Sequence, residues 1–115
     1  MIHYLARSAV FAASLCAAGL FSAEVGAQAQ PAPFAAGDAA AGKAMVDKDC
    51  IACHAKRFPG KPEQMYLRPD HKVRTPEQLL AQVRVCNSQL GKSYFPEEEE
   101  HIAAYLNSQY YKFKP

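Results

Sequence analysis

The chain has 115 residues, and its 13 lysines and arginines against 11 aspartates and glutamates leave a formal net charge of +2. A balance so close to neutral gives no reason to expect nucleic acid or a strongly acidic partner. Half of the residues are apolar, but the first thirty positions hold a disproportionate share of them, so the rest of the chain must be judged separately.

The first 29 residues have the pattern of a secretory signal peptide. A basic start that contains Arg7 precedes an apolar stretch over 8–21, and small residues then end in Ala27-Gln28-Ala29. The stretch of about 14 residues is shorter than the ~20 that span a bilayer, which favours cleavage over a membrane anchor. We therefore expect 1–29, including Cys16, to be removed after Ala29 or, as second choice, Ala27. Export to the periplasm and no stable membrane insertion would follow.

The 86 residues after position 29 can form one domain with a small core, and a domain of that size often needs a disulfide, a metal or another covalent aid. Residues 30–37 are rich in proline and alanine without periodicity, so we expect them to form a flexible tether. The domain itself would cover 38–115.

The helical signals begin at Asp38, a good N-cap for a first helix that runs toward Cys50. The segment 56–69 contains three prolines and a glycine, which cannot sustain a long helix, so we expect a loop there.

A second helix is predicted to open with Thr75 as N-cap, Pro76 at the first helical position and Gln78 completing a capping box, and to end at Gly91. Its inner face is formed by Leu79, Val83, Cys86 and Leu90, at spacings of four, three and four.

A third helix is predicted to begin near Pro96, with Ile102, Tyr105 and Leu106 on its inner side. No run alternates cleanly enough to predict a strand. The expected fold class is all-α.

The chemistry is concentrated in Cys50-Ile51-Ala52-Cys53-His54. Two cysteines three apart, with histidine directly after the second, form the attachment pattern for c-type haem. Each thiol adds to a vinyl group of the porphyrin, and His54 is then placed to bind the iron. We therefore expect one covalently attached haem c, with Cys50, Cys53 and His54 as its binding residues.

Three other interpretations are weaker. A thioredoxin-like redox pair belongs near a βαβ pattern, which this chain lacks. A zinc site would need two further ligands, and only the scattered Cys86, His71 and His101 are available. A disulfide between Cys50 and Cys53 would close a very short loop and would leave His54 without a role.

These residues resemble the class I monohaem cytochromes c. The resemblance covers Gly37-Asp38 and Ala41-Gly42, the haem motif, and the closing Ile102-Ala103-Ala104-Tyr105-Leu106. It implies a small cytochrome c fold over 38–115, with three main helices around one haem.

The resemblance also implies two packing details. Gly42 would let the first and last helices cross closely, with Tyr105 and Leu106 packed at the crossing. A carbonyl of Pro59 or Pro62 would accept the free N–H of His54 and orient its ring.

The chain departs from that family at the sixth iron ligand. The family usually supplies a methionine just before the last helix, but methionine occurs here only at positions 1, 45 and 65. Cys86 lies in the corresponding segment and is an odd thiol once the haem has taken Cys50 and Cys53. Cys86 is therefore the favoured ligand, ahead of His71, Met65 or an open or water-bound site.

The second half of the chain is also similar to a less common subgroup, the subunits of a heterodimeric dihaem cytochrome c with His/Cys-ligated haems from anaerobic ammonium-oxidising bacteria. The similarity lies in Val83-Arg84-Val85-Cys86-Asn87, in Phe95-Pro96-Glu97-Glu98-Glu99 and in the aromatic end of the chain. It implies a partner subunit and a very low reduction potential. A thiolate ligand itself favours ferric over ferrous iron, which points the same way.

The expected function is that of a periplasmic carrier that exchanges single electrons with redox partner proteins, as a monomer or as a homo- or heterodimer. No base, paired acids or substrate pocket is recognisable, so no enzyme is expected. The alternatives are a haem-based binder or sensor of small gases such as nitric oxide or carbon monoxide, and a haem subunit that tunes a larger cytochrome complex.

Overall fold

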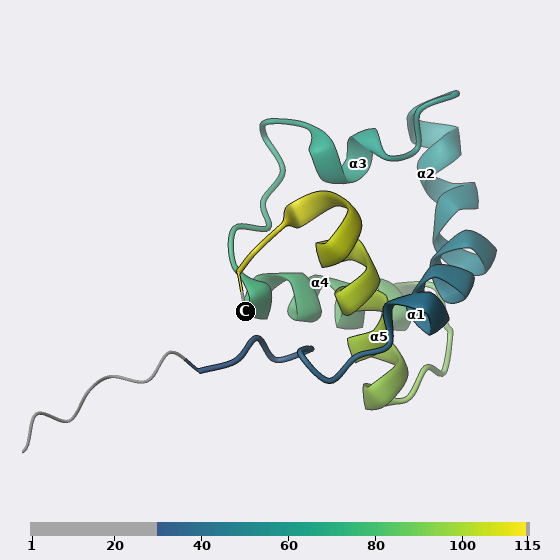
Figure 1. The fold of residues 1–115 in the computed structure, drawn as a ribbon. Helices are drawn as coiled ribbons and strands as arrows, with labels where there is room; N and C mark the ends of the chain where they lie inside the picture. Colours follow the sequence, from purple (N-terminus) through teal and green to yellow (C-terminus); the bar gives the residue numbers. More distant parts are fainter. Residues whose placement is uncertain (1–29, 115) are drawn as a thin grey trace, which may run out of the picture.

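The computed structural model describes residues 30–114, and all of their regular structure is helical (Figure 1). The helices in chain order are α1 (Ala39–Met45), η1 (Val46–Cys50), α2 (Ile51–Arg57), α3 (Gln64–Leu67), α4 (Pro76–Gln89), α5 (Pro96–Leu106) and η2 (Asn107–Tyr111). No strand occurs among these residues, so the all-α prediction is confirmed. The signal peptide predicted at 1–29 lies outside the described residues.

The first helix begins as predicted. Oδ1 of Asp38 accepts hydrogen bonds from the backbone N–H groups of Ala40 and Ala41 at 2.8 and 3.2 Å, which satisfies two donors that a helix start leaves unpaired. The helix does not stop at Cys50, however, because η1 and α2 extend it to Arg57.

The segment η1 is π-helical, with the N–H of Ile51 bonded to the carbonyl of Val46 five residues earlier. A turn of this kind holds an extra residue, so every later side chain is rotated by roughly 100° relative to an uninterrupted α-helix. Cys50 is the last residue of this turn. The face that α2 presents is therefore different from the face that α1 would continue.

Both ends of α4 follow the sequence prediction. Oγ1 of Thr75 accepts the N–H of Gln78 at 3.2 Å, and Gln78 Oε1 accepts the N–H of Arg74 at 2.7 Å, one residue earlier than in a standard capping box. At the other end Gly91 has a φ of +60°, and the N–H groups of Gly91 and Lys92 bond to carbonyls of the last turn. This is the Schellman arrangement.

The predicted inner face of α4 is correct except at its end, since Cys86 is half-buried and lines the cavity described below. Leu79 and Val83 are buried, but Leu90 is 38% exposed, and the buried Leu80 was not part of the predicted face. Leu90 is the C-cap residue of α4, at the end of the helix, and it lines this cavity together with the other three residues of the predicted face.

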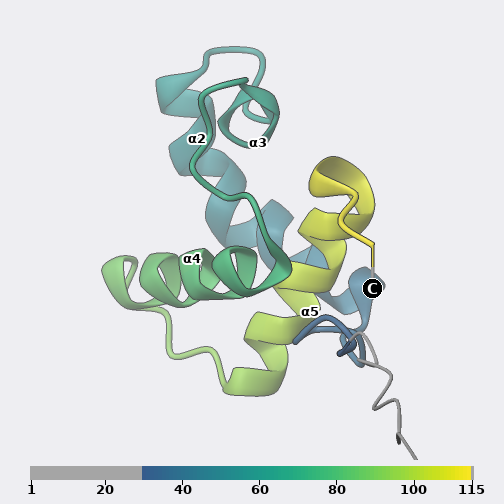
Figure 2. The same cartoon turned by 90° about the vertical axis from the view of Figure 1, so that its left-hand side faces the viewer.

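Helices α1 and α5 pack against each other (Figure 1, Figure 2), and Gly42 meets the backbone of α5 at this contact. A Cβ atom on Gly42 would lie 1.9 Å from the carbonyl oxygen of His101, far inside van der Waals contact. Ile102, Tyr105 and Leu106 are buried, as predicted for the inner side of this helix. The close crossing expected at Gly42 is therefore present.

Residues 30–37 differ from the expected flexible tether. Phe34 is 3% exposed and Ala32 is also buried, and both belong to the hydrophobic core. Backbone hydrogen bonds of 2.9 Å join Ala35 to Ala32 and Gly37 to Phe34. A single large aromatic side chain supplies enough buried apolar surface to hold a segment whose composition otherwise resembles a linker.

The segment between α2 and α4 is mostly loop, as predicted, but it includes the short helix α3 (Figure 1). Pro59, Pro62 and Pro69 all lie outside this helix. None of the helices between residues 30 and 114 combines the length and the apolar character needed to cross a membrane.

The crossing predicts a large loss of stability for Gly42→Ala. The added methyl group would collide with backbone atoms that cannot move aside, so we expect the free energy of unfolding to fall by about 3 kcal/mol. Urea denaturation followed by circular dichroism measures it. Gly91→Ala is the matched control, because a Cβ there meets open space and only its left-handed backbone costs about 1 kcal/mol. Equal losses in the two variants would contradict the crossing.

Candidate functional site

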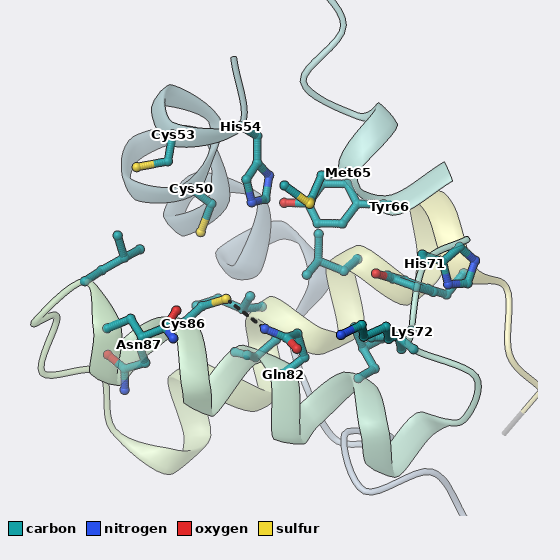
Figure 3. Close-up of a pocket in the computed structure, with 18 of the residues that line it drawn as sticks. Cys50, Cys53, His54, Met65, Tyr66, His71, Lys72, Gln82, Cys86 and Asn87 are labelled. Atoms are coloured by element: carbon teal, nitrogen blue, oxygen red, sulfur yellow. Dashed lines mark hydrogen bonds between the residues drawn. The ribbon is translucent and has the colours of Figure 1, made fainter. Parts of the chain in front are cut away.

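A cavity of about 460 Å³ lies between α2, α3 and α4 (Figure 3), within the range of roughly 300–1,000 Å³ that small-molecule and cofactor sites occupy. Its wall includes all six residues that the sequence singled out: Cys50, Cys53, His54, Met65, His71 and Cys86. Buried apolar side chains line much of the rest, among them Leu79, Val83 and Ile102. The fold thus brings together residues that are far apart in the sequence.

One wall of the cavity carries the cysteine-histidine motif. Figure 3 shows the sulfur of Cys50 and the ring of His54 directed into the cavity, with Cys53 at its edge. Burial raises the pKa of the Cys50 thiol to about 11, so the free chain holds it as a neutral thiol. Cys50, Cys53 and Cys86 are all free, and the disulfide considered for the first two is not formed.

His54 is held in an apolar environment. Its ring lies edge-on to that of Tyr66, with 5.0 Å between the ring centroids. Burial lowers the pKa of His54, which favours the neutral imidazole that binds metals. Its Nδ1 is buried and has no hydrogen-bond partner among the described residues.

The expected bond from His54 to a carbonyl of Pro59 or Pro62 is therefore absent. The carbonyl of Pro62 instead accepts the N–H of Met65 at 3.3 Å. This bond closes the backbone turn that leads into α3.

The opposite wall carries Cys86 on α4. Figure 3 shows its sulfur facing the cavity from the side opposite His54, and the residue is half-buried. Its Sγ accepts a hydrogen bond of 3.4 Å from Nε2 of Gln82, one turn earlier on the same helix. The negative charge that Cys86 would carry as a thiolate also contributes to the raised pKa of Cys50, as expected for two thiols that face one cavity.

The two less favoured ligands lie elsewhere in the cavity wall. Figure 3 shows Met65 beside His54 and Tyr66, on the same wall as the motif. His71 belongs to the loop between α3 and α4 and packs edge-on against Tyr111 at 5.4 Å. Of the remaining histidines considered for zinc, His101 does not line the cavity, and its Nδ1 accepts the N–H of Asp38 at 2.9 Å.

Three buried nitrogen atoms without a hydrogen-bond partner all belong to residues of this cavity: His54 Nδ1, Arg68 Nε and His71 Nδ1. Buried polar atoms are rarely left unpaired. Basic side chains are also present in the wall, from Arg57, Lys72 and Lys92 as well as Arg68. The cavity therefore suits a ligand that is largely apolar and carries acceptor or anionic groups.

A polar network that the sequence did not reveal braces α4 beside Cys86. Asn87 Nδ2 donates to Glu99 Oε1 at 2.8 Å and to the carbonyl of Tyr94 at 3.1 Å, and Asn87 Oδ1 accepts the N–H of Tyr94 at 3.2 Å. Glu99 is only 8% exposed, and Arg84 also donates to it, at 3.3 Å.

The network continues to the other cysteine wall through Asp49. Its carboxylate pairs with Lys92 Nζ at 2.7 Å and accepts the hydroxyl of Tyr94. These two donors hold the pKa of Asp49 below its ordinary value. Asp49 and Asn87 are the neighbours of Cys50 and Cys86, so the segment 92–94 ties the two walls together. No spacing rule could have found contacts between residues 45 apart.

Among residues 30–114, no group of three or more His, Cys, Asp or Glu side chains converges as a metal site made by protein alone would require. Comparisons of the chain with protein-family models, with curated proteins and with solved structures found no match.

The network predicts that Asn87→Ala destabilises the domain by about 2 kcal/mol, because the buried Glu99 carboxylate loses a donor and the Tyr94 backbone loses two bonds. Thermal and urea unfolding measure the effect. Gln89→Ala, an exposed position on the same helix, should change the stability by less than about 0.5 kcal/mol. If both variants are as stable as the wild type, Asn87 does not brace α4.

Proposed function

We propose that the protein is a c-type cytochrome that carries single electrons between protein partners, with one haem c covalently attached in the cavity between α2 and α4. One observation carries this proposal: the cysteine-histidine motif and Cys86, which are distant in the sequence, line one cavity from opposite walls.

The residues that line the cavity fit a haem c group. The thiols of Cys50 and Cys53 are free, as they must be to add to two vinyl groups. The Nδ1 of His54 lies buried at the cavity wall without a hydrogen-bond partner. This suits an imidazole that gains its binding partner only when a ligand occupies the cavity. Apolar walls and basic side chains match a porphyrin, whose ring is apolar and whose two propionates are anionic.

The close crossing of α1 and α5 at Gly42 supports the more specific proposal of a small cytochrome c fold. The packing of the first helix against the last fixes the start of η1, and η1 leads directly to the motif. The chain thereby positions Cys50, Cys53 and His54 from a rigid base.

Haem bound here would supply reversible one-electron exchange between ferric and ferrous iron. His54 would bind the iron from α2, and Cys86 is the favoured second ligand because it faces the cavity from the opposite side. Met65 is less suited, since it lies beside His54. Iron needs only these two protein ligands when a porphyrin supplies the other four.

Cys86 as a ligand favours a low reduction potential. A cysteine binds iron as a thiolate, because the metal displaces the thiol proton. The negative charge of the sulfur neutralises ferric iron better than ferrous iron, and its effect is strong in a wall built from apolar side chains such as Val83 and Leu79. Basic residues at the cavity wall, including Arg57 and Lys72, would favour an acidic redox partner. A periplasmic location would follow if 1–29 acts as the predicted signal peptide.

Covalent attachment is tested with variants of the two motif cysteines in the full chain, produced together with a c-type maturation system. The double variant Cys50→Ala/Cys53→Ala should retain no haem after denaturation, and each single variant should yield much less holoprotein, because it keeps one thioether. Mass spectrometry and haem staining of denaturing gels measure this. Cys86→Ala is the control and should keep its haem. Wild-type protein without covalent haem would refute the proposal.

The ligand role of Cys86 is tested by Cys86→Met, which replaces a thiolate with a neutral thioether. We expect changed absorption and paramagnetic-resonance spectra and a potential raised by more than about 120 mV, or two tenfold steps of 59 mV for one electron. Equilibrium potentiometry provides the value. Met65→Leu and His71→Gln should leave the spectra unchanged. Unchanged spectra in Cys86→Met would exclude Cys86 as a ligand.

A further inference from the structure

The sulfur of Cys86 has a neighbour of its own. Nε2 of Gln82 lies 3.4 Å from Sγ and donates a hydrogen bond to it (Figure 3). Residues four apart on a helix are neighbours on one face, and both side chains line the cavity. Among the hydrogen bonds of residues 30–114, this is the one made to that sulfur.

The helix that carries both residues is held at its two ends. Thr75 caps its start and Gly91 closes its end, while Asn87 bonds it to α5 and to Tyr94. The spacing between Gln82 and Cys86 is therefore set by an α-helix that is held at both ends. The amide of Gln82 reaches the sulfur within this helix, so no loop has to move for the bond to form.

A hydrogen bond to a ligating sulfur changes how much negative charge that sulfur donates to a metal. The N–H dipole stabilises negative charge on the sulfur, so less charge is donated to the iron. Ferric iron depends on that donation more than ferrous iron does, and hydrogen bonds to a ligating cysteine are accordingly a known means of tuning a potential.

We propose that Gln82 is a positioning residue that sets the reduction potential of the site through Cys86. Its amide orients the sulfur toward the cavity and raises the potential above the value that an unassisted thiolate would give. This inference rests on the proposed function, because it needs Cys86 as an iron ligand.

The neighbouring glutamines have no equivalent contact. Gln78 is engaged at the helix start, where its side chain accepts the N–H of Arg74. Gln89 lines the same cavity, but the side-chain hydrogen bonds described for residues 30–114 place no bond between it and Cys86. Gln89 is therefore a matched control for Gln82, since it has the same side chain, helix and cavity.

The test uses the haem-loaded full chain with Gln82→Leu, Gln82→Met and Gln89→Leu. Gln82 is exposed, so both of its variants should fold. At a fixed ambient potential the ratio of ferric to ferrous protein should rise about three- to tenfold in both Gln82 variants, where tenfold corresponds to a potential lower by 59 mV. Gln89→Leu should leave the ratio unchanged. Potentials equal to the wild type in both Gln82 variants, or equal shifts at Gln89, would overturn the proposal.

A second readout separates tuning from a general structural effect. Loss of the hydrogen bond should raise the iron–sulfur stretching frequency in resonance Raman spectra of Gln82→Leu. In a Cys86→Met background, Gln82→Leu should shift the potential much less, because a neutral thioether carries no charge for the amide to stabilise. An equal shift in that background would also overturn the proposal.

The spectra of Cys86→Met distinguish the two possible failures. If they equal those of the wild type, Cys86 is not a ligand, and both the ligand assignment and the role of Gln82 are wrong. If they change while both Gln82 variants keep the wild-type potential, the ligand assignment stands and only the inference about Gln82 fails.

Discussion

The contact between Gly42 and the backbone of α5 is the constraint on which the rest of the structure depends. It sets how closely the first and last helices approach, and any side chain larger than hydrogen at position 42 would meet the carbonyl of His101. Because η1 and α2 continue directly from α1, this contact also places the cysteine-histidine motif relative to the core. The buried Ile102 and Leu106 of α5 then form part of the cavity wall, so helix packing and the candidate site share the same residues.

Signals that act over a few residues allowed the helix ends to be predicted. Asp38, Thr75 and Gly91 each perform a role that depends on their nearest neighbours, and the structure shows all three in that role. The same local reasoning failed at Phe34, because a proline- and alanine-rich composition says nothing about whether one aromatic ring finds a place in the core. It failed at Leu90 because this residue caps the end of α4, where its side chain is 38% exposed.

The candidate site was predictable in its parts but not in its assembly. Cys50, Cys53 and His54 form a short motif, and Cys86 was singled out because no late methionine is present. These four residues line one cavity only because of tertiary packing, which a local motif does not reveal. The bonds of Asn87 to Glu99 and of Asp49 to Tyr94 depend on the same packing. The expected bond from a proline carbonyl to His54 is absent, and the buried Nδ1 of that ring has no partner among the described residues.

The π-helical turn at Val46–Cys50 lets α1 pack against α5 while α2 presents a different face to the cavity. A regular α-helix would have to do both with a single, unbroken helical register. Before this turn, Gly42 packs against α5. After it, Cys53 and His54 line the cavity. Shortening this turn by a single amino acid would restore an ordinary helical winding and swing the whole downstream segment away by roughly 100°. A deletion in this stretch would therefore turn Cys53 and His54 away from the cavity wall that they now line.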